Sequence, residues 1–239
     1  MARRDRPGRP KGRRLSVRLK QAKGRKASST RWLMRQLNDA YVAEAKELGL
    51  RSRAAFKLIQ LDDKFHILTP GKRVVDLGAA PGGWTQVAVA RVGASGAGAG
   101  KGRAGRVVAL DILGMEPVPG ATVLQRDILA EDTPKLLREA LGGPADVVLS
   151  DLAPNATGHA QTDHLRIMAL AEAAFEFARG VLGPGGAFVA KVFQGGAHGE
   201  LLAALKREFQ AVKHAKPPAT RRESAETYVV ALGFRGPPE

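Results

Sequence analysis

The sequence predicts an α/β fold in which a seven-stranded, mostly parallel sheet with one antiparallel strand is covered by helices on both faces. From residue 73 onward, short apolar runs alternate with segments of helical periodicity, which is typical of a parallel sheet. The connection before the final run, residues 215–226, is only about a dozen residues long and contains Pro217-Pro218. A parallel crossover usually needs a helix in that space, so we expect the last two strands to be antiparallel.

Two helices are expected to precede the sheet. Residues 41–48 have high helix propensity and are followed by Gly49, which favours a helix end. Ser52 can cap a second helix. The apolar stripe of that helix consists of Phe56, Ile59, Leu61 and Phe65. Pro70-Gly71 then separates it from the first strand.

The alternating region supplies seven strands and four more helices, with short apolar runs assigned to strands and longer amphipathic runs to helices. The expected strands are residues 73–77, 106–110, 121–125, 146–150, 187–193, 209–214 and 227–234. The expected helices are residues 84–92, 132–141, 163–182 and 199–208. Residues 93–105 are rich in glycine and alanine and cannot pack a core, so we expect a flexible surface loop there.

Length and composition limit the classes to which the protein can belong. Its 239 residues suffice for one large α/β domain, which we place at residues 29–239. No apolar run approaches about 18 residues, so no membrane span is expected. The absence of cysteine excludes disulfides, thiolate metal sites and cysteine nucleophiles. The five histidines form no cluster with the spacing of metal ligands, so we expect no bound metal.

The net charge of +15 is concentrated in the first 35 residues, which hold 14 Lys and Arg residues and a single acid, Asp5. Residues 1–28 contain too few apolar side chains to fold alone, so a disordered arm is expected. A basic arm on a nearly neutral domain favours a polyanionic partner such as nucleic acid. A solvated tail without a partner and an organelle transit peptide are the alternatives. Pro7 and Pro10 would break the amphipathic helix of a transit peptide, and the expected location is the cytoplasm.

The most informative segment is Val74–Trp84, in which an apolar strand runs into a glycine-rich turn and then a helix. Gly78 and Gly82 allow a ligand to approach the backbone closely, and Asp76 lies at the strand end where α/β sheets bind ligands. The G-x-G-x-x-G pattern of dinucleotide sites is not met, because Ala80 stands at its third position. S-adenosylmethionine, which has an amino-acid moiety and no pyrophosphate, is therefore favoured over a dinucleotide. An ordinary tight turn is the alternative.

Acids lie at or just beyond the carboxyl ends of the first four expected strands. They are Asp76, Asp111, Asp127 and Asp151. Asp111 can accept both ribose hydroxyls of an adenosine, and Asp127 is placed to meet the adenine amino group. Each of them alone could be a solvated loop acid or a helix cap, but four at one edge of a sheet predict a cofactor site.

Two lysines stand out in apolar surroundings, and one further acid lies at a strand start. Lys191 interrupts the strand run 187–193, where an unpaired charge is costly, and Lys57 lies within the apolar run 54–59. Glu226 lies where the last strand begins. The alternatives are a snorkelling strand end for Lys191 and solvated surface positions for Lys57 and Glu226.

Four segments in a fixed order give these residues a family context. They are Ser-Arg-Ala-Ala-Phe-Lys-Leu at 52–58, the glycine motif ending in Trp84, Ser-Asp-Leu-Ala-Pro-Asn at 150–155 and Lys-Val-Phe-Gln-Gly at 191–195. Together they resemble the FtsJ/RrmJ family of ribosomal RNA ribose 2′-O-methyltransferases, over roughly residues 29–235. The resemblance implies a Rossmann-like methyltransferase fold that uses S-adenosylmethionine.

The resemblance also implies roles for individual residues. The family's Lys-Asp-Lys-Glu tetrad, which holds the target ribose, maps onto Lys57, Asp151, Lys191 and Glu226, with Lys191 as the proton acceptor. Its cofactor residues map onto Gly82, Trp84, Asp111, Asp127 and Asp151. The bacterial branch, which this chain resembles in length and layout, methylates a uridine ribose in large-subunit (23S-type) ribosomal RNA. The longer basic arm and the Gly/Ala-rich insertion depart from the family's pattern and bear on RNA docking.

We therefore expect a monomeric, metal-independent enzyme that methylates a ribose of ribosomal RNA, with the large ribosomal subunit as partner. The ribose hydroxyl would attack the methyl group in line while Lys191 removes its proton. Stabilisation of a developing alkoxide by Lys191 and Lys57 is the other role open to these lysines. The competing functions are a 2′-O-methyltransferase acting on tRNA, a non-catalytic ribosome-assembly factor and a nucleotide-dependent oxidoreductase.

Overall fold

The structure is a computed structural model that describes Thr30 and residues 33–34, 36–95, 104–154, 157–193 and 199–236. The predicted basic arm, residues 1–28, and most of the predicted Gly/Ala-rich loop lie outside the described residues. Within the described part of the chain, no helix is both long and apolar enough to cross a lipid bilayer.

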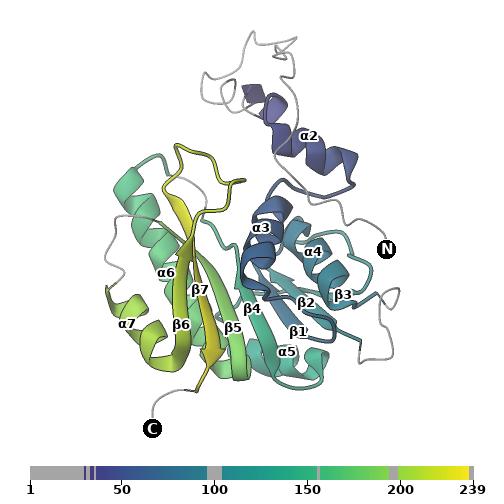
Figure 1. Cartoon of the computed structure of the whole chain (residues 1–239), viewed down its shortest axis with the longest axis vertical. Helices are drawn as coiled ribbons and strands as arrows, with labels where there is room; N and C mark the ends of the chain where they lie inside the picture. Colours follow the sequence, from purple (N-terminus) through teal and green to yellow (C-terminus); the bar gives the residue numbers. More distant parts are fainter. Residues whose placement is uncertain are drawn as a thin grey trace.

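Seven strands form a single sheet in the order β3-β2-β1-β4-β5-β7-β6 (Figure 1). They are β1 (Arg73–Leu77), β2 (Arg106–Asp111), β3 (Ala121–Gln125), β4 (Ala145–Ser150), β5 (Leu182–Phe193), β6 (Phe209–Ala215) and β7 (Glu226–Phe234). Each neighbouring pair in the run β3-β2-β1-β4-β5 is parallel, whereas β7 is antiparallel to both β5 and β6. The predicted mixed sheet with an antiparallel final pair is confirmed.

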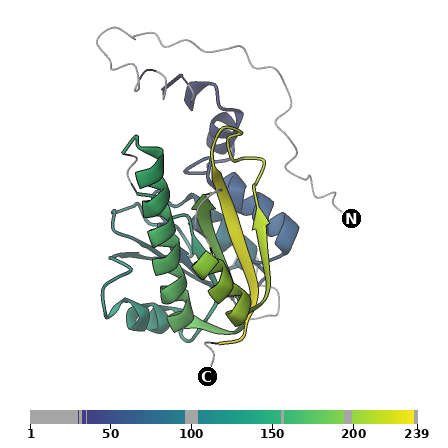
Figure 2. The ribbon, with the colours of Figure 1, turned by 90° about the vertical axis from the view of Figure 1, so that its left-hand side faces the viewer.

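Helices cover both faces of the sheet, as Figure 2 shows. They are α2 (Ala40–Glu47), α3 (Ala55–Phe65), α4 (Gly83–Val92), α5 (Thr133–Leu141), α6 (Ala160–Val181) and α7 (Gly199–Glu208). Side chains of α5, α6 and α7 form one apolar core with the sheet, and those of α3 and α4 form a second core on the opposite face. The α2 helix lies beyond the edge of the sheet, above α3 in Figure 1.

The burial of β1 explains why its sequence is apolar without alternation. Val75 and Leu77 belong to the core beneath α5 and α6, whereas Val74 belongs to the core beneath α3 and α4. A parallel strand covered on both faces has no solvent side, so both sets of alternating side chains must be apolar. Asp76 is the exception, and it is fully buried.

From residue 73 onward, two element boundaries differ by more than one residue from those expected. The β5 strand begins at Leu182 and not at 187, because Leu182 pairs with Ala145 before a register shift that precedes Val147. The α6 helix begins at Ala160 and not at 163. The carboxylate of Asp163, in its first turn, accepts hydrogen bonds from the backbone of residues 157 and 158 and so secures the earlier start.

The direction of strand addition reverses at the centre of the sheet, between β1 and β4. From β1 the chain continues outward to β2 and β3, whereas from β4 it continues in the opposite direction to β5. In open α/β sheets, ligands bind beyond the carboxyl ends of the strands where the order reverses in this way. The edge between β1 and β4 is therefore the place where a functional site is expected.

Candidate functional site at the carboxyl edge of the sheet

The turn between β1 and α4 is held against the neighbouring β2 strand. Gly78 and Gly82 have φ values of 73° and 105°, which only glycine adopts without strain. A Cβ atom at Gly78 would also lie 2.8 Å from Cδ2 of Leu152. The amide of Ala80 donates to Oδ2 of Asp111 over 2.9 Å. The turn is thus shaped by its two glycines and attached to the acid that ends β2.

Arg51 fixes the other side of the same turn, and the sequence did not point to it. Its guanidinium donates to the carbonyl oxygens of Pro81 (3.2 Å), Glu116 (2.5 Å) and Pro117 (2.6 Å). A Cβ atom at Gly82 would lie 2.9 Å from this guanidinium. Arg51 therefore ties the segment before α3 to both loops of the predicted cofactor site.

Asp76 is a fully buried acid with one free acceptor atom. Its Oδ2 accepts a 2.7 Å hydrogen bond from Oγ1 of Thr85, whereas its buried Oδ1 has no hydrogen-bond partner in the described part of the chain. Burial raises the pKa of Asp76 to about 7, assisted by the negative charges of Asp151 and Asp111 and opposed by the bond from Thr85. A cationic ligand group at Oδ1 would satisfy this atom and favour the ionised form of the carboxyl group.

Asp111 and Asp127 lie at the ends of β2 and β3, where each accepts a backbone hydrogen bond. Oδ1 of Asp111 accepts from the amide of Leu113 over 2.8 Å, and Oδ1 of Asp127 accepts from the amide of Leu129 over 2.9 Å. Each carboxylate oxygen has a second lone pair, so both acids can accept further bonds from a ligand.

Exposed apolar side chains flank these two acids. They are Ile112, Leu113 and Leu129, which are 66%, 63% and 74% exposed. A groove of about 870 Å³ opens beside Leu113. Its lining residues are Arg51, Ala80, Pro81, Leu113, Gly114, Met115 and Glu116. Sequence reasoning missed these apolar side chains, although their position one or two residues after Asp111 or Asp127 was a usable signal. Apolar walls beside hydrogen-bonding acids suit a flat heteroaromatic group such as adenine.

Trp84, one of the predicted cofactor residues, has its side chain in the protein core. The indole is 3% exposed, and its Nε1 donates to the carbonyl oxygen of Ala54 over 2.8 Å. The indole therefore connects α4 to the start of α3 and does not face a ligand. Only the backbone amide of Trp84, in the first turn of α4, is in a position to meet one.

The other predicted site residues come together from four elements. Lys57 lies on α3, Asp151 follows β4, Lys191 lies near the end of β5 and Glu226 begins β7. Nζ of Lys57 lies 2.6 Å from Oε1 of Glu226, and Nζ of Lys191 lies 2.7 Å from Oδ1 of Asp151. Lys191 also donates to the Asp151 carbonyl oxygen over 2.9 Å. The cluster thus contains two ion pairs, both largely buried, with no net charge.

Tyr228 joins the two ion pairs and was not predicted from the sequence. Its hydroxyl lies 2.7 Å from Oδ1 of Asp151 and 3.0 Å from Oε1 of Glu226. Nζ of Lys57 lies 5.8 Å from the centre of its ring. Since side chains two apart on a strand share a face, the spacing of Glu226 and Tyr228 on β7 was the available signal.

The two bridging groups have shifted pKa values with identifiable causes. Burial alone would raise the pKa of Asp151, but the charges of Lys191 and Lys57 and hydrogen bonds from Lys191 and Tyr228 bring it below its usual range. Burial, together with the charges of Asp151 and Glu226, raises the pKa of Tyr228 well above its usual value. Asp151 is therefore ionised and Tyr228 protonated at neutral pH, so the tyrosine acts as the donor.

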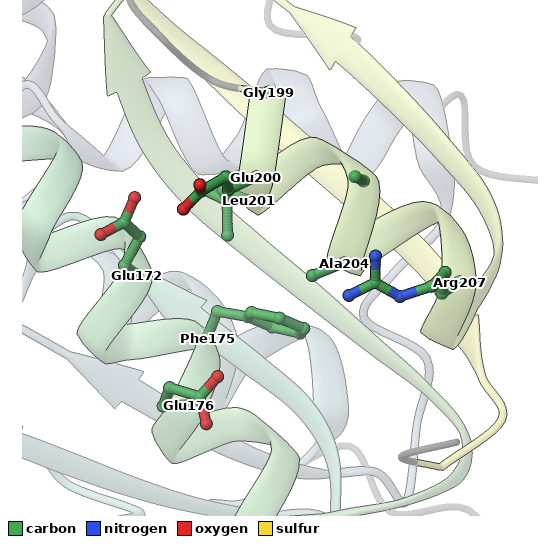
Figure 3. Close-up of a pocket in the computed structure, with 9 residues that line it drawn as sticks. Glu172, Phe175, Glu176, Gly199, Glu200, Leu201, Ala204 and Arg207 are labelled. Carbon is green, nitrogen blue, oxygen red and sulfur yellow. The ribbon is translucent and has the colours of Figure 1, made fainter. Parts of the chain in front are cut away.

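Another groove lies between α6 and α7, where none of the predicted site residues is found (Figure 3). Its volume is about 590 Å³. Its lining residues are Glu172, Phe175, Glu176, Gly199, Glu200, Leu201, Ala203, Ala204 and Arg207. Among the described residues, no group of three or more His, Cys, Asp or Glu side chains is arranged to hold a metal ion. Within this part of the chain, the sheet edge is thus where the predicted site residues gather.

Comparison with known proteins places this edge in a family. The family model described as FtsJ-like methyltransferase matches residues 50–234. A relative from Paramagnetospirillum magneticum named ribosomal RNA large subunit methyltransferase E is 66% identical over 227 residues, which cover 95% of this chain and 91% of the relative. A protein of the same name from Rhodospirillum rubrum is 60% identical over 222 residues, covering 93% and 82%.

A solved structure gives the same result for the fold. The crystal structure described as a ribosomal RNA methyltransferase from Plasmodium falciparum is 30% identical to this chain, with a TM-score of 0.67. The match covers 78% of this chain and 99% of that one. The family match spans most of the chain and includes every residue described at the sheet edge. The predicted resemblance is therefore confirmed, and the chain belongs to the FtsJ-like methyltransferase family.

Proposed function

We propose that this protein transfers a methyl group from S-adenosylmethionine to the 2′-hydroxyl of a uridine ribose in large-subunit (23S-type) ribosomal RNA. The observation that carries the proposal is the largely buried Lys-Asp-Lys-Glu cluster beside a glycine turn at one edge of the sheet. The printed names of the relatives support ribosomal RNA as the substrate. A nucleotide-dependent oxidoreductase is disfavoured because the turn departs from the dinucleotide pattern.

The residues beside the glycine turn fit S-adenosylmethionine. The unpartnered, buried Oδ1 of Asp76 suits the ammonium group of an amino acid. Asp111 has free lone pairs for ribose hydroxyls, and Asp127 with the exposed Leu113 and Leu129 suits an adenine ring. When bound, S-adenosylmethionine supplies an electrophilic methyl group. The chain's own contribution at this side is to orient that group toward the lysine cluster.

On the acceptor side, Lys191 is proposed to take the proton of the ribose hydroxyl. Two contacts with Asp151 hold its Nζ in place, so the lone pair of the deprotonated amine would have a fixed direction. Lys57, held by Glu226, would lie beside the oxygen that develops negative charge. When Lys191 is in its neutral, proton-accepting form, the hydrogen bond from Tyr228 and the charge of Lys57 still stabilise the Asp151 carboxylate.

The remaining parts of the proposal concern the setting of the reaction. We infer a cytoplasmic, monomeric enzyme that works without a metal and acts on ribosomal RNA within the large subunit. Residues 1–28 would add affinity for RNA through phosphate neutralisation. These statements rest on composition and on the names of the relatives.

The test uses large ribosomal subunits and free 23S-type RNA from a strain that lacks the gene. The purified full-length protein is incubated with each RNA and with labelled S-adenosylmethionine, and the labelled ribose is mapped. We expect one methylated uridine in the subunit sample. Bulk tRNA from the same strain serves as the competing substrate. Labelling of tRNA alone would establish the tRNA alternative, and absence of labelling in every RNA would favour the non-catalytic assembly factor.

A further inference from the structure

A cationic groove lies beside the Lys-Asp-Lys-Glu cluster, between α2 and the β6–β7 connection, residues 216–225. Its volume is about 470 Å³. Its lining residues are Tyr41, Lys216, Pro217, Pro218, Thr220 and Arg222. The connection ends at Glu226 of the cluster, whose amide donates to Oγ of Ser224 over 3.2 Å. Figures 1 and 2 both show α2 and this connection side by side above the sheet. One wall of the groove is thus joined along the chain to the proposed active site.

The groove has a rigid frame. The β6–β7 connection is fixed to α3 because the amide of Ala219 donates to Oε1 of Gln60 over 2.8 Å. Ala219 is fully buried and forms a small apolar cluster with Phe56 of α3 and Ala45 of α2. Lys216 holds the connection in shape by donating to the carbonyl oxygens of Arg222 and Ser224. The residues that line the groove are therefore held in place by the protein's own contacts before a ligand binds.

The groove presents cations that are not neutralised within the protein. The exposed guanidinium of Arg222 makes no ion pair or hydrogen bond with any described residue. Beside it, two guanidinium groups pair with the same carboxylate oxygen, Oδ2 of Asp39. Nη1 of Arg53 lies 2.9 Å from this oxygen, and Nη2 of Arg221 lies 3.4 Å from it. Two guanidinium groups on one carboxylate leave an excess positive charge. Lys216 uses two of its three N–H donors on carbonyl groups and retains one.

A second, independent observation points to a ligand with hydrogen-bonding atoms. Thr220 lines the groove and is 7% exposed, yet its hydroxyl has no hydrogen-bond partner among the residues that the structure describes. Nε of Arg53, next to the groove, is likewise buried without a partner. Buried polar atoms are rarely left unsatisfied in a folded protein, and each one calls for an explanation such as a bound water, ion or ligand.

We propose that this groove binds the RNA strand directly beside the target nucleotide, with Arg222 and Lys216 on a phosphate and Thr220 on a neighbouring polar atom of the sugar or phosphate. The inference rests on the proposed function. Tyr41, which lines the groove, accepts a 3.3 Å hydrogen bond from Gln60. Gln60 lies three residues after Lys57 on α3, so one helical turn separates this contact from the cluster. Its positive charge would repel the chain's own basic arm and attract a polyanion. One strand can therefore occupy the groove and present its next ribose to Lys191.

The test compares Arg222→Glu and Thr220→Val with a control, Lys206→Glu. Lys206 is exposed on α7, at the opposite end of β6, so the control changes the net charge equally at a remote place. Binding to unmethylated 23S-type RNA and single-turnover methylation are measured over a range of salt concentrations. For Arg222→Glu we expect about tenfold weaker RNA binding and a salt slope smaller by about one. Thr220→Val should weaken binding about threefold without changing the slope. Rates at saturating RNA and affinity for S-adenosylmethionine should stay within about twofold in every variant.

Each other outcome is informative. Equal losses in Arg222→Glu and Lys206→Glu would show that only net charge matters and would overturn the groove. Unchanged binding to naked RNA with impaired methylation of intact subunits would indicate a ribosomal protein as the partner and overturn the RNA assignment. If the wild-type protein methylates RNA but Arg222→Glu behaves as wild type, the groove fails and the proposed function stands. If the wild-type protein methylates no RNA, the proposed function is wrong, and the RNA-binding comparison of the variants still tests the groove.

Discussion

The acidic side chains on the two halves of the sheet edge have different interaction partners. On the half formed by β1, β2 and β3, the carboxylates of Asp76, Asp111 and Asp127 accept hydrogen bonds from a hydroxyl and from backbone amides, and from no other kind of donor among the described residues. On the half formed by β4, β5 and β7, Asp151 and Glu226 each pair with a lysine. One half thus has uncompensated negative charge, and the other is neutral.

This difference matches the chemistry of the two proposed ligands. A sulfonium cofactor is cationic, so an edge with unpaired acids attracts it and gains from binding it. A ribose hydroxyl is neutral and must lose a proton, so it needs a base and a compensated environment. The division also explains why Asp76 has a raised pKa and Asp151 a lowered one although both are buried.

The largest expected effect comes from Lys191, on the neutral half. Lys191→Ala should lower the single-turnover rate by about 10²–10⁴-fold, the usual contribution of general acid–base catalysis, and leave S-adenosylmethionine affinity nearly unchanged. Calorimetry and single-turnover methylation at saturating RNA measure the two quantities. A rate within about tenfold of wild type would exclude the general-base role.

Lys191→Arg separates the two roles open to this lysine. Arginine keeps the positive charge but cannot be deprotonated in a protein, so it cannot act as a base. A general base predicts that Lys191→Arg is as inactive as Lys191→Ala. Substantial retained activity would instead favour stabilisation of a developing alkoxide by charge.

The second effect concerns the acidic half. Asp111→Ala should weaken S-adenosylmethionine binding by roughly 5- to 150-fold, because it removes an acceptor worth about 1–3 kcal/mol. The loss includes any loosening of the turn at Ala80, because Asp111 accepts a hydrogen bond from the Ala80 amide. Glu131→Ala, an exposed acid after β3, is the matched control. Unchanged calorimetric binding in Asp111→Ala would remove this residue from the site.

Tyr228 tests whether the two ion pairs work as one unit. Tyr228→Phe should reduce the turnover rate by about tenfold and the free energy of unfolding by about 1.5–3 kcal/mol, since it removes a hydrogen bond to a charged group. Cofactor affinity should not change. If the tyrosine positions Asp151, the pH dependence of the rate should also shift. A loss of stability with an unchanged rate profile would limit Tyr228 to a structural role.

The smallest expected effect is a difference in pH dependence between the halves. The raised pKa of Asp76 means that the folded state binds an extra proton between about pH 4 and 7, so its contribution to stability falls as pH rises through that window. Asp76→Asn should remove this trend and gain at most about 2 kcal/mol relative to wild type between pH 5 and 7. Denaturant unfolding at several pH values measures it.

Asp151 should show the opposite sign. Its lowered pKa stabilises the folded state above the pKa of the unfolded chain, and this contribution is lost as pH falls through the folded-state value. Asp151→Asn should therefore cost most at neutral pH and progressively less on acidification. Parallel curves for Asp76→Asn and Asp151→Asn would contradict the contrast between the two halves.

The residues that sequence reasoning found share one property: their chemistry is visible from local pattern. Gly78 and Gly82 stand in a strand-to-helix turn, and Lys191 is a charge within an apolar strand. The residues it missed are ordinary in their local context. In the sequence, Tyr228 looks like any other residue of a strand, and Arg51 looks like an ordinary positively charged residue of a loop. Only the approach of distant segments gives each a partner, 77 positions away for Tyr228 and Asp151.

The sequence alone determined the α/β class, nearly all strand and helix positions, the antiparallel final strand and the family, because periodicity, glycine placement and connection length act locally along the chain. The tertiary structure alone decided which charges are paired. The pairs Lys57–Glu226 and Lys191–Asp151 depend on the strand order that brings β4, β5 and β7 side by side. It likewise turned the Trp84 indole into the core and left Oδ1 of Asp76 without a partner. The physical reason is that burial and charge compensation are properties of neighbours in space, which no spacing along the sequence specifies.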